Sequence, residues 1–185
     1  NVYAESIESS LEFDGVNDFA ELSGIDVSGT SFSVEFWGRR NSLGGNDFFM
    51  GQGPIGTNTS LHIGFRASGE FTFAFFNNDL NTPVYLDLDW HHWALTYDAT
   101  TNARKIYRDG ILVASDVATG DYVGTGDILL GDVSVGGSPI NGNIDELRIW
   151  DGVRTENQIN NYLNACLEGN ESNLVAYYKF DELAG

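Results

Sequence analysis

The chain has 185 residues, and its 27 acidic against nine basic residues give a net charge of −18. This length fits one domain. A surface this acidic excludes general binding of nucleic acids and other polyanions, and it suits divalent cations. Aromatic residues and glycines are abundant while helix formers are scarce, which predicts many short strands joined by glycine turns.

No run reaches the roughly 18 apolar residues of a membrane span, and the first residues lack the charged-then-apolar order of a signal peptide. We therefore expect a mature or excised module that forms one domain over residues 1–185. The single cysteine, Cys166, excludes an intramolecular disulfide and is expected to fill the core.

Alternating polar and apolar residues predict strands along most of the chain. In the third of these, Phe32, Val34 and Phe36 are expected on the core side, and Trp37 and Arg39 on the other. The stretches that predict strands are 10–15, 19–22, 31–40, 48–52, 61–66, 70–76, 89–98, 105–113, 127–131, 142–151 and 174–180.

Turn and cap signals connect these strands. Ser68-Gly69 and Asp109-Gly110 each predict a hairpin turn. Thr155, followed three residues later by Gln158, predicts the capping box of one short helix that ends at Gly169. The last strand is expected to pair with the start of the chain. The pattern predicts an all-β fold: a two-sheet antiparallel β-sandwich, or jelly roll, with one short helix near the C-terminus.

The stretch 142–151 is expected to be a central strand with one anomalous position. By strict alternation Asp145 shares a face with Leu147 and Ile149, where a carboxylate is costly unless cations or hydrogen-bond donors meet it. It is either a half-solvated residue at the start of the strand or a metal ligand. The segment 13–19 near the N-terminus, with Asp14 and Asp18, has the same acidic character.

Several stretches together resemble laminin-G-like jelly-roll domains of the concanavalin A-like lectin and glucanase superfamily. They are Ser-Leu-Glu-Phe-Asp-Gly-Val-Asn-Asp-Phe, Phe-Ser-Val-Glu-Phe-Trp, Trp-His-His-Trp-Ala-Leu-Thr-Tyr-Asp, Ile-Tyr-Arg-Asp-Gly, Gly-Asn-Ile-Asp-Glu-Leu-Arg-Ile-Trp and Leu-Val-Ala-Tyr-Tyr-Lys-Phe. Each motif alone is weak, but six in this order cover nearly the whole chain. The resemblance implies a module of a secreted or cell-surface protein, such as those attached to bacterial enzymes and adhesins.

The resemblance also implies a structural calcium ion where the first strand meets the last core strand. Asp145 matches the ligand position of that family, and Asp14, Asn17 or Asp18 would contribute from the other end. Calcium accepts a mixture of carboxylates and backbone carbonyls, so this set suits it. The alternative is that Asp14 and Asp18 only shape a turn.

The sequence predicts no enzymatic activity. Hydrolases of the superfamily carry two glutamates and an aspartate on one strand, because retaining glycoside cleavage needs two carboxylates about 5 Å apart. No strand here has that pattern, and Glu35 and Glu146 are single carboxylates beside arginines. No nucleophile elbow or phosphate loop is present either.

Binding is therefore the expected function. Aromatic plates with planar hydrogen-bonding groups hold sugar rings, and arginine adds affinity for carboxylate or sulfate groups. The non-core, concave face is expected to bind a glycan, including anionic polysaccharide. The residues predicted to form this site are Trp37, Arg39, His62, Arg66, His92, Arg108 and Arg148.

Two alternatives remain at this stage. Trp37 and Trp150 could be covered by loops, with the arginines paired to Glu35 and Glu146 for stability. The chain could instead be a protein-interaction or structural adhesin module with no glycan ligand, working beside other domains of a larger host protein. A large exposed apolar patch would favour the second of these alternatives.

Overall fold

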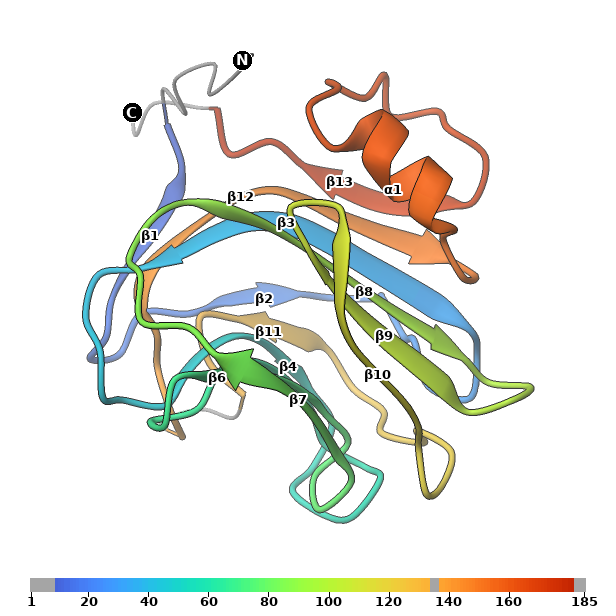
Figure 1. The fold of residues 1–185 in the computed structure, drawn as a ribbon, viewed down its shortest axis with the longest axis horizontal. Helices are drawn as coiled ribbons and strands as arrows, with labels where there is room; N and C mark the ends of the chain where they lie inside the picture. Colours follow the sequence, from blue (N-terminus) through green and yellow to red (C-terminus); the bar gives the residue numbers. More distant parts are fainter. Residues whose placement is uncertain (1–8, 134–136, 182–185) are drawn as a thin grey trace.

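The computed structural model describes residues 9–133 and 137–181 and confirms two antiparallel sheets packed face to face (Figure 1). Sheet A has the order β1-β12-β3-β8-β9-β10, with β13 also paired to β12, and sheet B has the order β2-β11-β4-β5-β6-β7. The strands of sheet A are β1 (Leu11–Asp14), β3 (Phe32–Arg40), β8 (His91–Asp98), β9 (Ala103–Arg108), β10 (Ile111–Val117), β12 (Asn141–Asp151) and β13 (Leu174–Tyr178). Those of sheet B are β2 (Ala20–Leu22), β4 (Asp47–Gln52), β5 (Leu61–Phe65), β6 (Glu70–Ala74), β7 (Asp79–Val84) and β11 (Ile128–Leu130).

Apolar side chains from both sheets form one core between the layers. Phe32, Val34 and Phe36 of β3 lie in it, as their alternation predicts. Trp93 of sheet A stacks on Phe71 of sheet B, with ring centroids 3.8 Å apart. Fully burying an aromatic or aliphatic side chain contributes about 1.5–3 kcal/mol, so this contact helps to hold the sheets together.

Both predicted hairpins are present. Asp109 and Gly110 have φ angles of 52° and 76°, as the tight turn between β9 and β10 requires. Gly69, with φ 93°, turns the chain between β5 and β6. The sequence pattern missed β7, because this edge strand contains Pro83 and several polar residues.

The two ends of the sheet meet along β12. β1 pairs with β12 from Leu11 opposite Ile144, and β13 pairs with it from Tyr178 opposite Leu147. β3 occupies the other edge of β12, so β1 and β13 lie end to end along one edge. The expected direct pairing of the first and last strands is therefore wrong. β12 has 11 residues and is long enough to pair with both short strands.

The helix α1 (Glu156–Tyr162) begins with the predicted capping box of Thr155 and Gln158. It ends at Tyr162 rather than at Gly169. The carbonyls of Tyr162 and of Ala165, in the loop that follows, accept hydrogen bonds from Arg148. Cys166 follows in the loop and is exposed, so its expected place in the core is wrong.

α1 lies on the side of sheet A that faces away from sheet B (Figure 1). Its one buried residue, Ile159, packs with Ala94 of β8 and Tyr107 of β9 in a small cluster separate from the main core. The helix therefore covers part of the outer face of sheet A.

Candidate functional site

The outer face of sheet A carries most of the predicted binding residues, and the strand register sets their positions. Trp37 of β3 lies between His92 of β8 and Asp145 of β12. Two residues earlier in β3, Glu35 lies opposite Arg148. Aromatic and charged side chains therefore alternate across three neighbouring strands.

A β-bulge decides which face Asp145 occupies. The register between β12 and β3 shifts between Asp145 and Arg148, and Glu146 has a φ of 51°. The extra residue reverses the alternation, so Ile144 and Leu147 both point into the core. Asp145 lies opposite Trp37 on the outer face, and its expected place on the face of Leu147 is wrong.

One half of this face is covered, because α1 and the loop after it lie over Arg148. The Arg148 guanidinium donates to the Glu146 carboxylate at 2.7 Å and to the carbonyls of Tyr162 and Ala165 at 2.6 and 2.8 Å. Only 1% of Arg148 is exposed. Arg148 therefore fastens the helical segment to the sheet and cannot reach a ligand.

A second arginine completes the cover. Arg154 lies over the ring of Trp150, with its guanidinium carbon 3.8 Å from the ring centroid, and its Nε donates to Glu35 at 3.2 Å. Burial raises the pKa of the Glu35 carboxyl, and the positive charges of Arg154 and Arg148 oppose that rise. This half matches the alternative in which arginines pair with the two glutamates and Trp150 is covered.

His92 belongs to the same covered half. It is fully buried, with Nε2 3.7 Å from a Glu35 oxygen. Burial, together with repulsion from Arg148, lowers the pKa of His92 to about 3, so the ring is neutral at physiological pH. His92 supports Trp37, whose ring it meets edge-on at 5.7 Å between centroids.

The other half of the face is open. Trp37, Arg39 and Trp90 are all partly exposed there. The Arg39 guanidinium lies 5.2 Å from the ring centroid of Trp90, and Trp37 Nε1 donates to the Leu163 carbonyl at 3.3 Å. We call these three residues the Trp-Arg strip. Trp90 directly precedes β8 and was not among the predicted binding residues. It lies two residues before His92, so strand alternation places it on the same face.

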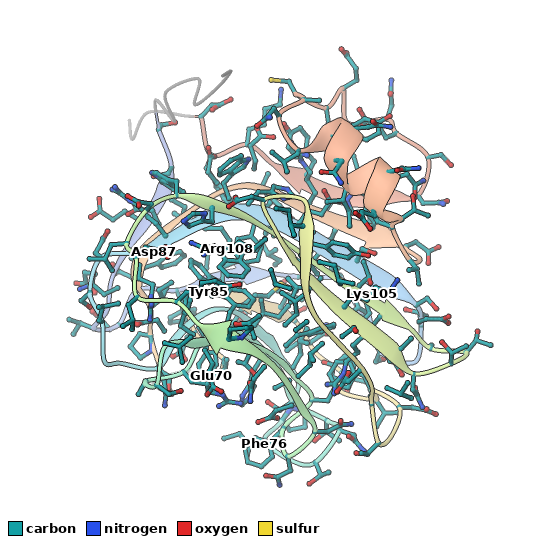
Figure 2. The ribbon with its side chains drawn as sticks, in the orientation of Figure 1. Glu70, Phe76, Tyr85, Asp87, Lys105 and Arg108 are labelled. Atoms are coloured by element: carbon teal, nitrogen blue, oxygen red, sulfur yellow. The ribbon has the colours of Figure 1, made fainter. Side chains whose placement is uncertain are left out.

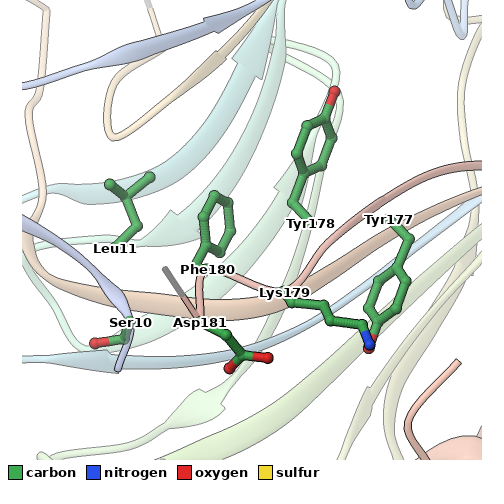
Figure 3. Close-up of a pocket in the computed structure, with 7 residues that line it drawn as sticks. All are labelled: Ser10, Leu11, Tyr177, Tyr178, Lys179, Phe180 and Asp181. Carbon is green, nitrogen blue, oxygen red and sulfur yellow. The ribbon is translucent and has the colours of Figure 1, made fainter. Parts of the chain in front are cut away.

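A pocket of about 670 Å³ opens where β1 and β13 meet (Figure 3). Its lining combines three aromatic rings with hydroxyl, amine and carboxylate groups. The residues that line this junction pocket are Ser10, Leu11, Tyr177, Tyr178, Lys179, Phe180 and Asp181. Strand alternation alone could not find this pocket, because it forms only where the ends of two strands meet.

Hydrogen bonds connect the Trp-Arg strip to the junction pocket. Arg39 Nε donates to Asn143 Oδ1 at 3.1 Å, and Asn143 Nδ2 donates to Ser10 Oγ at 3.2 Å. Asn143 is buried, and its side chain holds Arg39 through the first of these bonds and Ser10 through the second. Two hydrogen bonds therefore link the strip to Ser10 in the pocket, whose other side, formed by Leu11, Tyr178 and Phe180, packs against the core.

Three predicted binding residues lie elsewhere. His62 and Arg66 belong to sheet B, where His62 packs between the rings of Phe48 and Phe76 and Arg66 pairs with Asp79 at 2.8 Å. Burial lowers the pKa of His62 to about 4, and the charge of Arg66 adds to the effect.

Arg108 lies at one end of the sandwich. It stacks on Tyr85, at 4.1 Å to the ring centroid, and pairs with Asp87 at 2.7 Å (Figure 2). The seven predicted binding residues therefore do not form a single face.

The four predicted calcium ligands do not converge either. Asp14 Oδ1 accepts from the Val16 amide at 2.8 Å, and Asp18 Oδ2 accepts from the Asp14 amide at 3.1 Å, so these carboxylates shape the turn that contains Asn17. Asp14 lies opposite Asn141, four residues before Asp145 on β12. That separation is about 13 Å along the strand.

The fourth predicted ligand, Asp145, differs from the other three in being buried. It is 5% exposed, and Oδ1 accepts from the Glu146 amide at 2.9 Å. Burial raises its pKa to about 7, and the negative charges of Glu146 and Asp181 add to that effect. Among the described residues, no group of three or more His, Cys, Asp or Glu side chains is arranged to hold a metal ion. Asp145 is therefore buried apart from the other three predicted ligands, and calcium at this position stays a prediction.

Comparisons with known proteins agree with this architecture. Residues 14–160 match the laminin-G family model of the concanavalin A-like lectin/glucanases superfamily, and the chain belongs to that family. The chain is 33% identical over 113 residues to the rat (Rattus norvegicus) sushi, von Willebrand factor type A, EGF and pentraxin domain-containing protein 1, and 32% identical to the mouse (Mus musculus) protein. Each match covers 54% of this chain and 3% of the relative's length.

Solved structures share the fold at lower identity. A proposed carbohydrate-binding protein from Bacteroides ovatus aligns with a TM-score of 0.70 and 23% identity, over 91% of this chain and 52% of that one. The CBM40 module of the Ruminococcus gnavus IT-sialidase, bound to alpha2,3-sialyllactose, aligns with a TM-score of 0.67 and 15% identity. The alignment covers 83% of this chain and 96% of that one. The heptameric SAP-like pentraxin of Limulus polyphemus aligns with a TM-score of 0.64 and 13% identity, over 86% of this chain and 83% of that one.

Proposed function

We propose that the chain is a non-catalytic carbohydrate-binding module and that its glycan site combines the Trp-Arg strip with the junction pocket. The observation that carries this proposal is the hydrogen-bonded link between the two: Asn143 joins Arg39 of the Trp-Arg strip to Ser10, which lines a pocket of about 670 Å³ together with aromatic and polar side chains. The likeness to carbohydrate-binding structures supports the same class of function.

The chemistry of this region suits a sugar. The faces of Trp37 and Trp90 would pack against the apolar faces of pyranose rings. Arg39, held by Asn143, offers planar donors to ring hydroxyls or to a carboxylate or sulfate group. Lys179 adds a second exposed cation within an otherwise acidic molecule. The proposed ligand therefore includes glycans with anionic substituents.

The distribution of carboxylates supports the proposal of binding without catalysis. Glycoside hydrolysis needs a pair of carboxylates placed on either side of the scissile bond. Asp181 is the one carboxylate among the residues that line the junction pocket. Glu35 and Glu146 are held by Arg154 and Arg148. We therefore assign the region to recognition.

A structural calcium ion at Asp145 is part of the proposal. Its buried carboxylate would supply one oxygen ligand, and Asp181, whose charge acts on Asp145, is a candidate for a second. A bound cation would neutralise this carboxylate and tie the β12 bulge to the ends of β1 and β13.

We also propose that the module works outside the cell, as part of a longer secreted or surface protein. The chain matches 3% of the length of its curated relatives, so the activities and partners of those proteins concern much larger molecules. No helix in the described part of the chain is long and apolar enough to span a membrane.

The test is a polysaccharide array that includes neutral, uronic-acid and sialylated glycans, followed by calorimetry on any ligand found, with calcium and with a chelator. Trp90→Ala and Arg39→Ala should each weaken binding by about tenfold or more. Arg66→Ala on sheet B and Phe19→Ala, which removes an exposed ring elsewhere, serve as matched controls and should leave the affinity unchanged.

Two results would refute the proposal. If the chain bound no glycan on the array, with calcium or with chelator, carbohydrate binding would be refuted. Loss of binding in Arg66→Ala with full binding in Trp90→Ala would move the site to the other sheet. The second candidate function is protein interaction. It is favoured by the exposed apolar residues Ile111, Leu112 and Val117 of β10, the edge strand of sheet A.

A further inference from the structure

His91, the first residue of β8, meets a carboxylate with each of its two ring nitrogens. Nδ1 lies 2.7 Å from Asp109 Oδ2, and Nε2 lies 3.0 Å from Asp87 Oδ1. The first contact is a hydrogen bond. The buried Nε2 finds no hydrogen-bond partner among the described residues, so the second contact is an ion pair. The ring therefore joins the loop before β8 to the turn between β9 and β10.

This pair of contacts depends on the proton content of the ring. A neutral imidazole carries one N–H, and its other nitrogen presents a lone pair that a carboxylate oxygen repels. Both contacts of His91 are therefore attractive only when the ring is doubly protonated, a change that imidazole undergoes near neutral pH. Burial by itself would raise the pKa of Asp109, but the hydrogen bonds that its carboxylate accepts from the His91 ring and the His92 amide outweigh burial and lower that pKa. Asp109 is thus ionised at neutral pH.

The charged groups around the ring come from three segments. Arg108 of β9 donates to the same Asp87 oxygen at 2.7 Å. Asp89 of the same loop and Arg39 of β3 are further charged side chains on the neighbouring segments. Asp87, Asp109 and Arg108 together leave one negative charge uncompensated, and the protonated ring neutralises it.

The contact between Asp87 and His91 closes a short loop that contains Trp90. The two residues are four positions apart, and Trp90 directly precedes His91. Leu86 and Leu88 in this segment are 63% and 42% exposed, so burial of these apolar side chains contributes little to its position. The polar contacts of Asp87 therefore help to hold the backbone that presents the Trp90 ring.

We propose that His91 is a positioning residue of the glycan site, and that its protonation closes the loop 87–91 and so sets the place of the Trp90 ring. This inference rests on the proposed glycan function of the Trp-Arg strip. Affinity is highest where the ring is protonated, below about pH 6, and falls as the pH rises toward about 8. Arg108 keeps Asp87 attached throughout, so the expected loss of affinity is about fivefold.

The structure separates His91 from the other groups that titrate. The chain has three histidines. Burial lowers the pKa of His62 to about 4 and that of His92 to about 3, so both of these rings stay neutral between about pH 5 and 8. Asp145, opposite Trp37, does titrate in this range, because burial raises its pKa to about 7. The experiment therefore includes Asp145→Asn.

The first test needs no ligand. In NMR spectra recorded with chelator from about pH 5 to 8, the Trp90 indole N–H signal should shift with the same midpoint as the His91 ring signals. Trp90→Phe identifies that indole signal by its absence. The shift should persist in Asp145→Asn and disappear in His91→Gln, whose amide can still donate to Asp109 but cannot gain a charge. A Trp90 signal that stays fixed, or that moves equally in His91→Gln, would overturn the proposal.

The second test measures affinity by calorimetry, with sialyllactose as an acidic probe and lactose as its neutral counterpart. Binding should weaken by about fivefold between about pH 5.5 and 8 in the wild type, and His91→Gln and Asp87→Asn should each lose this dependence. Asp79→Asn is the matched control, because Asp79 pairs with Arg66 on sheet B as Asp87 pairs with Arg108, and it should behave as the wild type. Thermal melting verifies that each variant folds.

The two tests fail separately. If the Trp90 signal follows His91 and neither probe nor any glycan on the array binds, the proton-linked loop is confirmed and the glycan function is refuted. If a probe binds equally well at both pH values while the Trp90 signal moves, the loop does not act on the site, and the role of His91 as a positioning residue is refuted.

Discussion

The two halves of the outer face of sheet A are built from the same residue types but have different roles. In the covered half, Arg148 lies under α1 and its loop and Trp150 lies under Arg154, and the two arginines pair with Glu146 and Glu35. In the open half, Trp37, Arg39 and Trp90 remain partly exposed. Tryptophan and arginine on one face of a strand therefore do not by themselves indicate a binding surface.

The difference arises from what each arginine binds. Arg148 satisfies two carbonyls at the end of α1 as well as a carboxylate, so it holds a separate chain segment in place. Arg39 binds one amide oxygen within the sheet and keeps much of its donor capacity. A guanidinium with five donors can serve structure or recognition, depending on how many acceptors surround it.

The largest effect is expected from Arg148→Ala. Removing one partner of a buried charge pair, and leaving two carbonyls without a donor, should lower the free energy of unfolding by about 3–5 kcal/mol. Arg39→Ala, the matched change in the open half, should cost less than about 1 kcal/mol. Urea unfolding measures both, and equal losses would contradict the division of the face.

The next effect concerns Asp145 at the boundary between the halves. Its pKa is raised from 3.8 to about 7 in the folded chain. A raised pKa means that its stabilising contribution is complete below pH 3.8 and is lost as the pH rises toward 7. In chelator, Asp145→Asn should therefore match the wild type near pH 4 and exceed its stability by up to about 4 kcal/mol near pH 8.

Calcium sharpens the same comparison. If Asp145 binds the ion, calcium should raise the melting temperature of the wild type at pH 8 and leave that of Asp145→Asn unchanged. Identical melting of both proteins with calcium and with chelator would refute the metal proposal. Identical pH profiles of the two proteins would show that the Asp145 carboxyl titrates normally.

The smallest effect is expected at the start of α1. Thr155→Ala removes the side chain that accepts from the Gln158 amide and should cost about 1 kcal/mol. Hydrogen exchange should speed up in α1, while glycan affinity at the open half stays the same. Thr119→Ala, at an exposed threonine outside the helix, provides the control. A change in glycan affinity would mean that the helix also shapes the open half.

Local patterns predicted most of the fold. Alternation identified the core faces of β3, glycine turns marked the hairpins, and the capping box fixed the start of α1. Two elements escaped these rules for physical reasons. β7 is a polar edge strand with a proline, and the bulge at Glu146 inserts a residue that period-two counting does not anticipate.

The sequence by itself determined the two-sheet class, the acidic surface and the positions of most strands, because each depends on residue type and short spacing. It also proposed residues for a sugar site. Tertiary structure alone decided which of those residues are accessible. The junction pocket, the cover over Arg148 and the separation of Asp14 from Asp145 depend on contacts between segments far apart in the chain. Burial is a property of such contacts, and no local periodicity encodes it.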